Sequence, residues 1–255
     1  MATYAIGDIH GELEALDEVL AQVQPLLTPE DTLVFLGDFL DRGPDTRGVL
    51  ARVVGLKASA PCPVEALLGN HEEWFLKTYR DPTRHSWLLG MGGLETVRSY
   101  SPSAAELLRS ELQRAGIELL TSKVVLPYQV FFDTIPAAHL AFLEGLVTYV
   151  RTPDVVCVHG GARSGLAVEE QSQHDLVWGP VSFPDDYKGP DLLVYGHRCD
   201  GLLDEAGRAS PRLGPHGRTH GIDTIGRGVL TCLRFPDLRV FQGGAPTPSE
   251  PDERH

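Results

Sequence analysis

The sequence lacks the features that would place it among membrane, secreted or disulfide-rich proteins. It has no long apolar run and no basic segment near its N-terminus, so it predicts neither a membrane span nor a signal peptide. Its cysteines show no Cys-x-x-Cys spacing, which argues against a paired-thiol motif. We therefore expect a protein of the reducing cytoplasm.

An excess of positive charge is also missing. The chain has 22 Lys and Arg against 35 Asp and Glu, for a formal net charge of -13. Nucleic-acid duplexes and anionic membranes attract basic surfaces, and an excess of negative charge does not favour binding to either. Any anion-binding site must be built locally, from metal ions or a few arginines. The length of 255 residues and an apolar content of 42% fit one large soluble α/β domain or two small ones.

Short apolar runs that end at or near glycine recur along the chain and predict buried strands. The expected strands cover residues 3–6, 33–36, 64–68, 155–158 and 192–195, with closing strands at 221–233 and 238–241. Apolar residues at helical spacing predict helices from 12 to Pro25, over 49–56, from 72, over 104–115 and from Pro136 to 147. Alternating strands and helices favour an α/β fold.

We expect a single catalytic domain over residues 1–242. The segment from about 80 to 133 is less regular, and we interpret it as an insertion or cap packed beside the core. Proline, serine and acidic residues dominate from 243 to 255, which predicts a disordered tail.

Polar side chains of metal-ligand type follow each of the five central strands. They are Asp8 and His10; Asp38, Asp41 and Arg42; Asn70 and His71; His159; and His197. In open α/β sheets the ligand site forms at the carboxyl ends of the strands, so these residues should converge. Carboxylate, amide and imidazole ligands suit Mn²⁺, Fe²⁺ or Zn²⁺. There are more candidate ligands than one metal shell needs, which favours two ions that clamp a phosphoryl group.

Each motif alone has a plain structural explanation. The loop from Gly37 to Gly43 could be a polar turn, Asn70 could cap a helix, and His159 or His197 could be a structural histidine. Their shared position at strand ends is what favours a common site.

Three of the motifs also carry a resemblance to a known family. Gly-Asp-Ile-His-Gly at 7–11, Gly-Asp-Phe-Leu-Asp-Arg-Gly at 37–43 and Gly-Asn-His-Glu at 69–72 resemble the core motifs of the phosphoprotein phosphatase (PPP) family of calcineurin-like metallophosphoesterases. His-Gly-Gly at 159–161 and Gly-His at 196–197 resemble its late histidine elements. The stretch 93–100 is similar to one found in small bacterial members, including symmetrical diadenosine tetraphosphatases and Ser/Thr phosphatases.

The resemblance implies a four-layer αββα sandwich of two mixed sheets around a dinuclear centre. The implied ligands are Asp8, His10 and Asp38 for one ion, and Asp38, Asn70, His159 and His197 for the other. Mn²⁺ is the expected cofactor, with Fe or Zn²⁺ as alternatives.

The resemblance also implies roles in catalysis. A metal-bridging hydroxide would attack phosphorus directly. His71 would be the general acid, Asp41 would orient it, and Arg42 would hold the phosphate together with Asn70.

One departure from the family pattern concerns this phosphate clamp. Pro180 stands where the family commonly has a second phosphate-binding arginine, and proline has no side-chain donor. Arg163 and Arg198 are candidate replacements, although each could equally be a solvated arginine.

The favoured function is a metal-dependent phosphomonoesterase, most plausibly a Ser/Thr phosphoprotein phosphatase acting on a phosphorylated protein, peptide or small phosphoester. The first alternative is a dinucleoside polyphosphate hydrolase, whose more highly charged substrate calls for more cationic groups. A phosphodiesterase or nuclease role and a non-catalytic metal-binding module are further alternatives. No membrane or nucleic-acid duplex is expected as a partner.

Overall fold

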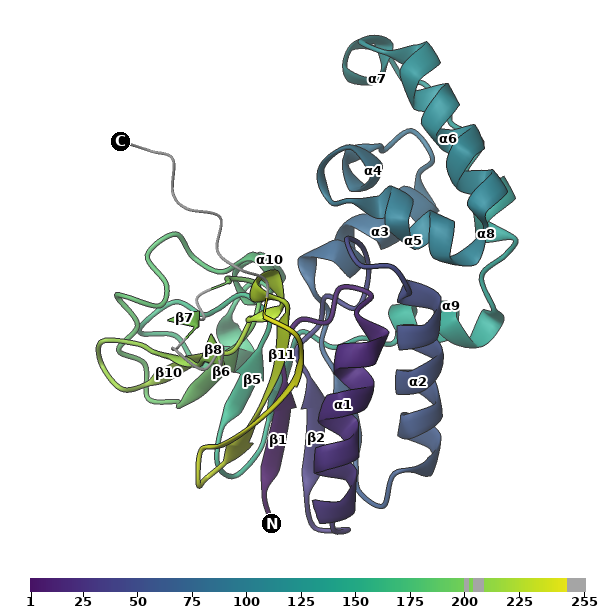
Figure 1. The fold of residues 1–255 in the computed structure, drawn as a ribbon. Helices are drawn as coiled ribbons and strands as arrows, with labels where there is room; N and C mark the ends of the chain where they lie inside the picture. Colours follow the sequence, from purple (N-terminus) through teal and green to yellow (C-terminus); the bar gives the residue numbers. More distant parts are fainter. Residues whose placement is uncertain (200–201, 204–208, 247–255) are drawn as a thin grey trace.

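The computed structural model describes residues 1–199, 202–203 and 209–246 (Figure 1). Its strands are β1 (Thr3–Ile6), β2 (Thr32–Phe35), β3 (Val64–Ala66), β4 (Tyr149–Arg151), β5 (Val156–Val158), β6 (Leu193–Tyr195), β7 (Leu202–Leu203), β8 (Ala209–Ser210), β9 (Arg212–Leu213), β10 (Thr219–Gly221), β11 (Val229–Phe235) and β12 (Arg239–Gly244). Its α-helices are α1 (Leu13–Val23), α2 (Thr46–Ser59), α3 (Asn70–Arg80), α4 (Ser86–Gly90), α5 (Gly93–Tyr100), α6 (Pro102–Ala115), α7 (Glu118–Thr121), α8 (Gln129–Phe132), α9 (Ala137–Glu144) and α10 (Gln173–Trp178). Short 3₁₀ turns cover Gln24–Leu26, Val168–Glu170 and Ile225–Arg227.

Ten of the strands form two mixed sheets of five strands each, which confirms the prediction of two mixed sheets, and β7 and β8 pair as a separate two-stranded sheet. The first has the order β12-β11-β1-β2-β3 and the second the order β4-β5-β6-β10-β9. In the first sheet β1, β2 and β3 are parallel, and β11 and β12 complete it in the antiparallel sense. In the second, β5, β6 and β10 are parallel between antiparallel neighbours. The carboxyl ends of β1, β2, β5 and β6 all lie at the upper edge of the sheets in Figure 1.

The two sheets pack face to face through apolar side chains. Ala5 and Val34 from the first sheet meet Cys157 and Val194 from the second in one buried cluster. Because both faces of these strands are covered, their sequences are almost wholly apolar instead of alternating. The buried thiol of Cys157 behaves as a small hydrophobe here.

The outer faces of the two sheets are covered differently. Helices α1 and α2 pack on the outer face of the first sheet, where Leu16 and Val53 join the largest apolar cluster (Figure 1). The outer face of the second sheet is covered by α10 and loops, through Leu176, Phe183 and Tyr187. The fourth layer is therefore thinner than a regular helical layer.

The segment between α3 and α9 is helical, containing α4 to α8, and α6 and α7 extend away from the sheets in Figure 1. Helix α5 packs against α2 and α6, which ties this segment to the core. Within the described part of the chain, no helix combines the length and apolarity needed to cross a membrane.

Some predicted boundaries were wrong. Helix α9 ends at Glu144 because Leu146 and Val147 leave it, and the Val147 N–H donates to the carbonyl of Ala66 at 3.2 Å. The predicted strand 221–233 is two strands, β10 and β11, separated by a loop that contains the 3₁₀ turn Ile225–Arg227. Gly243 and Gly244 belong to β12, paired with β11, and not to a tail. The predicted disorder of 247–255 falls outside the described residues.

Candidate metal centre and active site

The strand ends bring the predicted ligands to one place. Asp8 and His10 follow β1, Asp38 follows β2, His159 follows β5 and His197 follows β6. Asn70 and His71 open α3, which starts after β3. Gly69 is the N-cap of α3 and Asn70 is its first helical residue, so the Asn70 side chain does not cap the helix. The carboxamide oxygen of Asn70 instead lies 3.0 Å from His159 Nε2 and 2.8 Å from His197 Nδ1.

The backbone of the site is strained. His10, Asp38, Asp41, Arg42 and His197 all have positive φ, between 46° and 70°. Side chains other than glycine rarely adopt this conformation, at a cost of about 1–3 kcal/mol per residue, and such residues cluster where function demands a geometry. The surrounding packing and hydrogen bonds must offset that cost for the fold to hold these conformations.

Two glycines allow the loops to approach this closely. A Cβ on Gly37, whose φ is +104°, would lie 2.8 Å from the Gly69 nitrogen and 3.0 Å from His159 Nδ1. A Cβ on Gly69 would lie 2.1 Å from Asp38 Oδ1. Any larger residue at either position would push apart the loops that carry the ligands.

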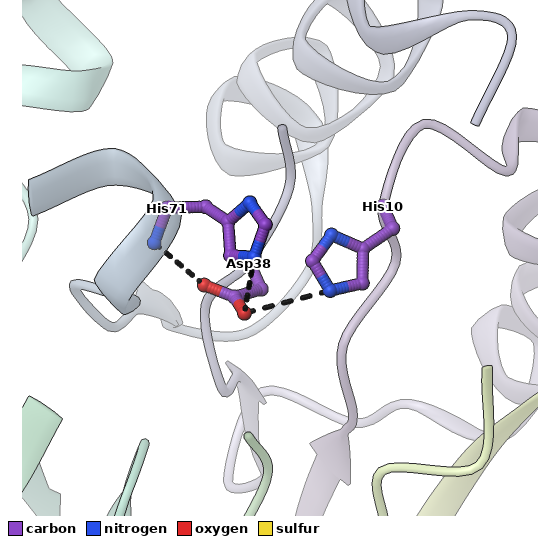
Figure 2. A group of neighbouring side chains, drawn as sticks. All are labelled: His10, Asp38 and His71. Carbon is purple, nitrogen blue, oxygen red and sulfur yellow. Dashed lines mark hydrogen bonds and ion pairs between the residues drawn. The ribbon is translucent and has the colours of Figure 1, made fainter. Parts of the chain in front are cut away.

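Asp38 lies between two groups of potential ligands. His10, Asp38 and His71 form one group and Asp38, His159 and His197 the other, each with ligand atoms within 4.8 Å of one another. Figure 2 shows the Asp38 carboxylate between the rings of His10 and His71, with Oδ2 at 3.5 Å from His10 Nε2 and 3.8 Å from His71 Nε2. Its other oxygen, Oδ1, lies 3.4 Å from His159 Nε2. Each carboxylate oxygen thus faces a different group, which is the geometry that a bridging ligand needs.

The ring tautomers test whether cations fit this centre. Nδ1 of His10 lies 2.8 Å from the Leu40 carbonyl oxygen, and Nδ1 of His159 lies 2.8 Å from that of Leu36. Only an N–H can pair with a carbonyl, so Nδ1 carries the proton in the neutral ring and the Nε2 lone pair points inward. His10 Nε2 is buried and has no hydrogen-bond partner among the described residues. His159 Nε2 faces the oxygen of Asn70, which is also an acceptor. Lone pairs that converge without a proton between them fit divalent cations.

The charge states agree with that fit. Burial lowers the pKa of His10 to about 3 and that of His197 to about 4, so both rings are neutral at pH 7. Burial alone would raise the pKa of Asp38, but His159, His71 and His10 outweigh it and hold that pKa below its ordinary value. Metal binding requires neutral imidazole and ionised carboxylate, and the site provides both.

Asp8 lies slightly apart from these two groups. Its carboxylate accepts the backbone N–H of His197 at 3.1 and 2.9 Å. Burial raises the pKa of Asp8 well above its ordinary value, and the neighbouring carboxylates of Asp223 and Asp38 raise it further. A cation among these buried carboxylates would relieve their mutual repulsion. The assignment of Asp8 as a ligand stays a prediction, and His71 takes the third place beside His10 and Asp38 in the structure.

A second constellation centres on the pair His71 and Asp41. His71 Nδ1 lies 2.8 Å from Asp41 Oδ2, and both side chains are fully buried. Burial lowers the pKa of His71, but Asp38 and Asp41 outweigh it, so the pKa lies above its ordinary value. On the opposite side of the ring, Arg42 Nη2 lies 3.0 Å from His71 Nε2. Because a guanidinium only donates, His71 Nε2 accepts this bond and Nδ1 carries the ring proton toward Asp41.

The sequence prediction missed the residues that hold Asp41. The indole N–H of Trp87 donates to both Asp41 oxygens at 3.0 Å, and the Thr96 hydroxyl donates to Oδ1 at 2.6 Å. Both residues come from the segment 80–133, in which no ligand spacing is visible. They lie 46 and 55 residues from Asp41 along the chain, so no local spacing links them to it, although Thr96 lies in the stretch 93–100 that carries a resemblance.

The prediction also missed the role of Glu72. Its buried carboxylate accepts the backbone N–H groups of Asp38, Phe39, Leu40 and Gly69 at 2.9–3.1 Å. The bond to Gly69 is half of a capping box, in which a glutamate at the third helical position bonds back to the N-cap. That signature was present in the sequence and could have indicated the helix start, but not the bonds to the Asp38 loop.

The two candidate replacement arginines have other partners. Arg163 forms a bidentate pair with Asp175, at 2.7 and 2.8 Å. Arg198 donates from Nη2 to the Pro180 carbonyl at 3.1 Å, and its charge helps to lower the pKa of His197 after burial and the charge of His159. A role in phosphate binding stays a prediction for both, and the geometry favours Arg198.

Comparison with known proteins gives the family. Residues 1–210 match the model of the calcineurin-like phosphoesterase family. That is most of the chain, so the protein belongs to this family and is a metallophosphoesterase. A relative from Pectobacterium atrosepticum, named symmetrical bis(5'-nucleosyl)-tetraphosphatase, is 29% identical over 94% of each chain.

Solved structures share the fold. A crystal structure provisionally assigned as a diadenosine tetraphosphatase has a TM-score of 0.60 and 20% identity, over 96% of this chain and 93% of that one. A protein serine/threonine phosphatase from Saccharomyces cerevisiae has a TM-score of 0.52 and 16% identity, over 99% of this chain and 82% of that one. At these identities the likeness shows the fold alone.

Proposed function

We propose that the protein is a dinuclear metal-dependent hydrolase that cleaves dinucleoside polyphosphates between their phosphates. The main support for this chemistry is the Asp38 carboxylate, which two groups of potential ligands share. Beside it lies the pair of His71 and Asp41, with 2.8 Å between Nδ1 and Oδ2. The substrate class rests on the Pectobacterium relative, which matches over 94% of both chains. This reverses the order of the sequence prediction, which favoured a phosphomonoesterase.

The residues of the chain would divide the work as follows. When bound, the two ions supply charge neutralisation at the phosphate and an acidified water. His10, His159, His197, Asn70, Asp38 and Asp8 hold them. Arg42 grips the phosphate through its guanidinium, which suits bidentate bonds to oxyanions. To act as the acid, His71 must be protonated at Nε2, which displaces the bond that Nε2 accepts from Arg42; it then gives that proton to the leaving oxygen, while Asp41 accepts a hydrogen bond from Nδ1 and keeps the ring oriented.

A phosphomonoesterase acting on phosphopeptides is the second candidate, favoured by the small number of cations near the site. Among the described residues Arg163 is paired with Asp175, and Arg198 is bonded to the Pro180 carbonyl. Arg42 is then the main cationic side chain facing His71. A monoester carries less charge than a tetraphosphate and needs fewer cations.

A substrate panel separates the two candidates. Diadenosine tetraphosphate, a phosphoserine peptide and p-nitrophenyl phosphate are compared by kcat/KM under Mn²⁺, Zn²⁺ and Mg²⁺, with elemental analysis of the purified protein. We expect diadenosine tetraphosphate to be preferred and to yield two ADP. A hundredfold preference for the phosphopeptide would reverse the order. Metal-loaded protein that hydrolyses none of them would overturn the proposal altogether.

The acid role has its own test. His71→Asn should retain bound metal yet slow turnover, most strongly for substrates with poor leaving groups. Loss of metal from this variant would instead make His71 a ligand, as its place beside His10 and Asp38 allows. Wild-type rates on the phosphopeptide would show that the acid role is wrong.

A further inference from the structure

A cluster of aromatic rings adjoins the metal centre. The rings of Trp74 and Trp178 lie 5.5 Å apart between centroids, and the His174 ring stacks on Trp178 at 6.2 Å. The Trp178 ring also meets the edge of the His197 ring at 5.9 Å. We call Trp74, Trp178 and His174 the aromatic surface. The chemistry described above uses none of these residues.

The aromatic surface starts directly at the ligands. Trp74 is four residues after Asn70 in α3, so the two side chains share one face of the helix. Trp178 is the last residue of α10 and touches the ring of His197. When the phosphate of a substrate lies at the metals, the group attached to that phosphate therefore lies against the aromatic surface.

The rings are held in place but not enclosed. The indole N–H of Trp178 donates to Glu73 Oε2 at 2.9 Å. Glu73 in turn accepts from Gln173 at 3.1 Å and pairs with Lys77 at 2.9 Å. Trp74 and Trp178 are only partly buried, whereas Trp87 has 0% exposure. Rings that are fixed and open to solvent are pre-organised for a planar ligand.

A cavity extends the aromatic surface on the side of Trp74. Its volume is about 410 Å³, within the range of small-molecule sites. Leu89, Leu119 and Leu120 line it together with two cationic residues, Lys77 and Arg84. Its apolar walls suit a base and sugar, while the two cations are already paired, Lys77 with Glu73 and Arg84 with Asp81.

We propose that the aromatic surface stacks a nucleobase of the substrate, with the cavity beside Trp74 taking the nucleoside. This rests on the proposed function, which puts the phosphates at the metals. Aromatic side chains bind bases through their π-faces whatever the base, so the surface should accept several dinucleotides. It would select nucleotides over inorganic polyphosphate by stacking and not by charge.

The test compares two substrates that differ only in carrying nucleosides. Diadenosine tetraphosphate and inorganic tetrapolyphosphate are assayed with wild type, Trp74→Leu, Trp74→Phe and Leu107→Ala. Leu107 is a half-exposed apolar residue of α6 that does not line the cavity, so it is the matched control. We expect Trp74→Leu to lose roughly tenfold or more in kcat/KM for the dinucleotide but not for tetrapolyphosphate, and Trp74→Phe to recover much of the loss.

A binding readout keeps the proposal separate from the proposed function. ADP should quench the fluorescence of the wild-type tryptophans, pyrophosphate should not, and Trp74→Leu should weaken the quenching. Metal-loaded protein that quenches with ADP but hydrolyses neither substrate would refute the function and leave the stacking intact. Equal losses on both substrates, or no quenching by ADP, would overturn the stacking. A loss confined to phosphopeptide substrates would make this a peptide subsite and would equally overturn it.

Discussion

Replacing Glu72 by glutamine should loosen the loop that presents Asp38 and so weaken metal binding. The carboxylate of Glu72 accepts four backbone N–H groups, two on each oxygen. Glutamine keeps one oxygen and puts an amide NH₂ in place of the other. Two buried N–H groups would then face a donor instead of an acceptor.

The magnitude follows from those two groups. A buried N–H without an acceptor costs about 1–3 kcal/mol of folding free energy, so two such groups cost about 2–6 kcal/mol. Because the loop can relax, we expect the free energy of unfolding to fall by about 3 kcal/mol. The strained backbone of Asp38, with φ at +51°, loses its support at the same time. We expect the melting temperature of the metal-free protein to fall by about 6–12 °C. The affinity for Mn²⁺ should fall about 100-fold, because about 2.7 kcal/mol of pre-organisation is lost.

Thermal unfolding in chelator and calorimetric titration with Mn²⁺ measure the two effects. Glu65→Gln is the control, because its carboxylate makes only a partly exposed pair with Lys57 at 3.5 Å. Such a pair contributes about 0–1 kcal/mol. If Glu72→Gln melts and binds Mn²⁺ like the wild type, Glu72 does not hold the loop and the reasoning is refuted.

Three further predictions follow from the same geometry. Asp38→Asn should abolish turnover and lower the metal content found by elemental analysis, since one bridging oxygen is replaced by NH₂; full occupancy would exclude a bridge. Trp87→Phe keeps an aromatic ring beside Phe75 and Phe131 but removes the N–H bonds to Asp41. We therefore expect kcat to drop about tenfold while the metal content stays unchanged. An unchanged kcat would show that Asp41 needs no such support. Chelation should abolish activity, and added Mn²⁺ should restore it. Mn²⁺ at 100 times its Kd should raise the free energy of unfolding by about 2.7 kcal/mol for each site. Activity that survives full metal removal would contradict the mechanism.

Much of the fold and most of the ligand set could be predicted from the sequence, because the signals are local. An apolar run that ends at glycine marks a buried strand, and a polar residue directly after it must lie at the sheet edge. These signals place Asp38, His159 and His197 at one edge although they follow three separate strands. The thin outer layer over the second sheet could not be foreseen, since loops and one short helix carry no periodic pattern.

The boundaries that failed did so for tertiary reasons. The apolar pattern from Pro136 continues through Val147, yet the helix ends at Glu144 because Val147 bonds to Ala66 beside β3. Gly243 and Gly244 have low strand propensity, yet they pair with Leu230 and Val229. In both cases hydrogen bonds to a distant partner outweigh the local preference.

The support of Asp41 changes how the segment between α3 and α9 should be understood. Asp41 is fully buried, and burial raises its pKa despite its bonds to His71, Thr96 and Trp87. A carboxylate in that position stays ionised beside His71 only while its donors remain in place. Trp87 is the second residue of α4 and Thr96 lies in α5, so under the proposed function these helices support the proposed acid pair. Opening them would release the orientation of His71 while leaving Asp38, His159 and His197 where they are. Activity and metal binding should therefore be separable through this segment, which a passive insertion would not allow.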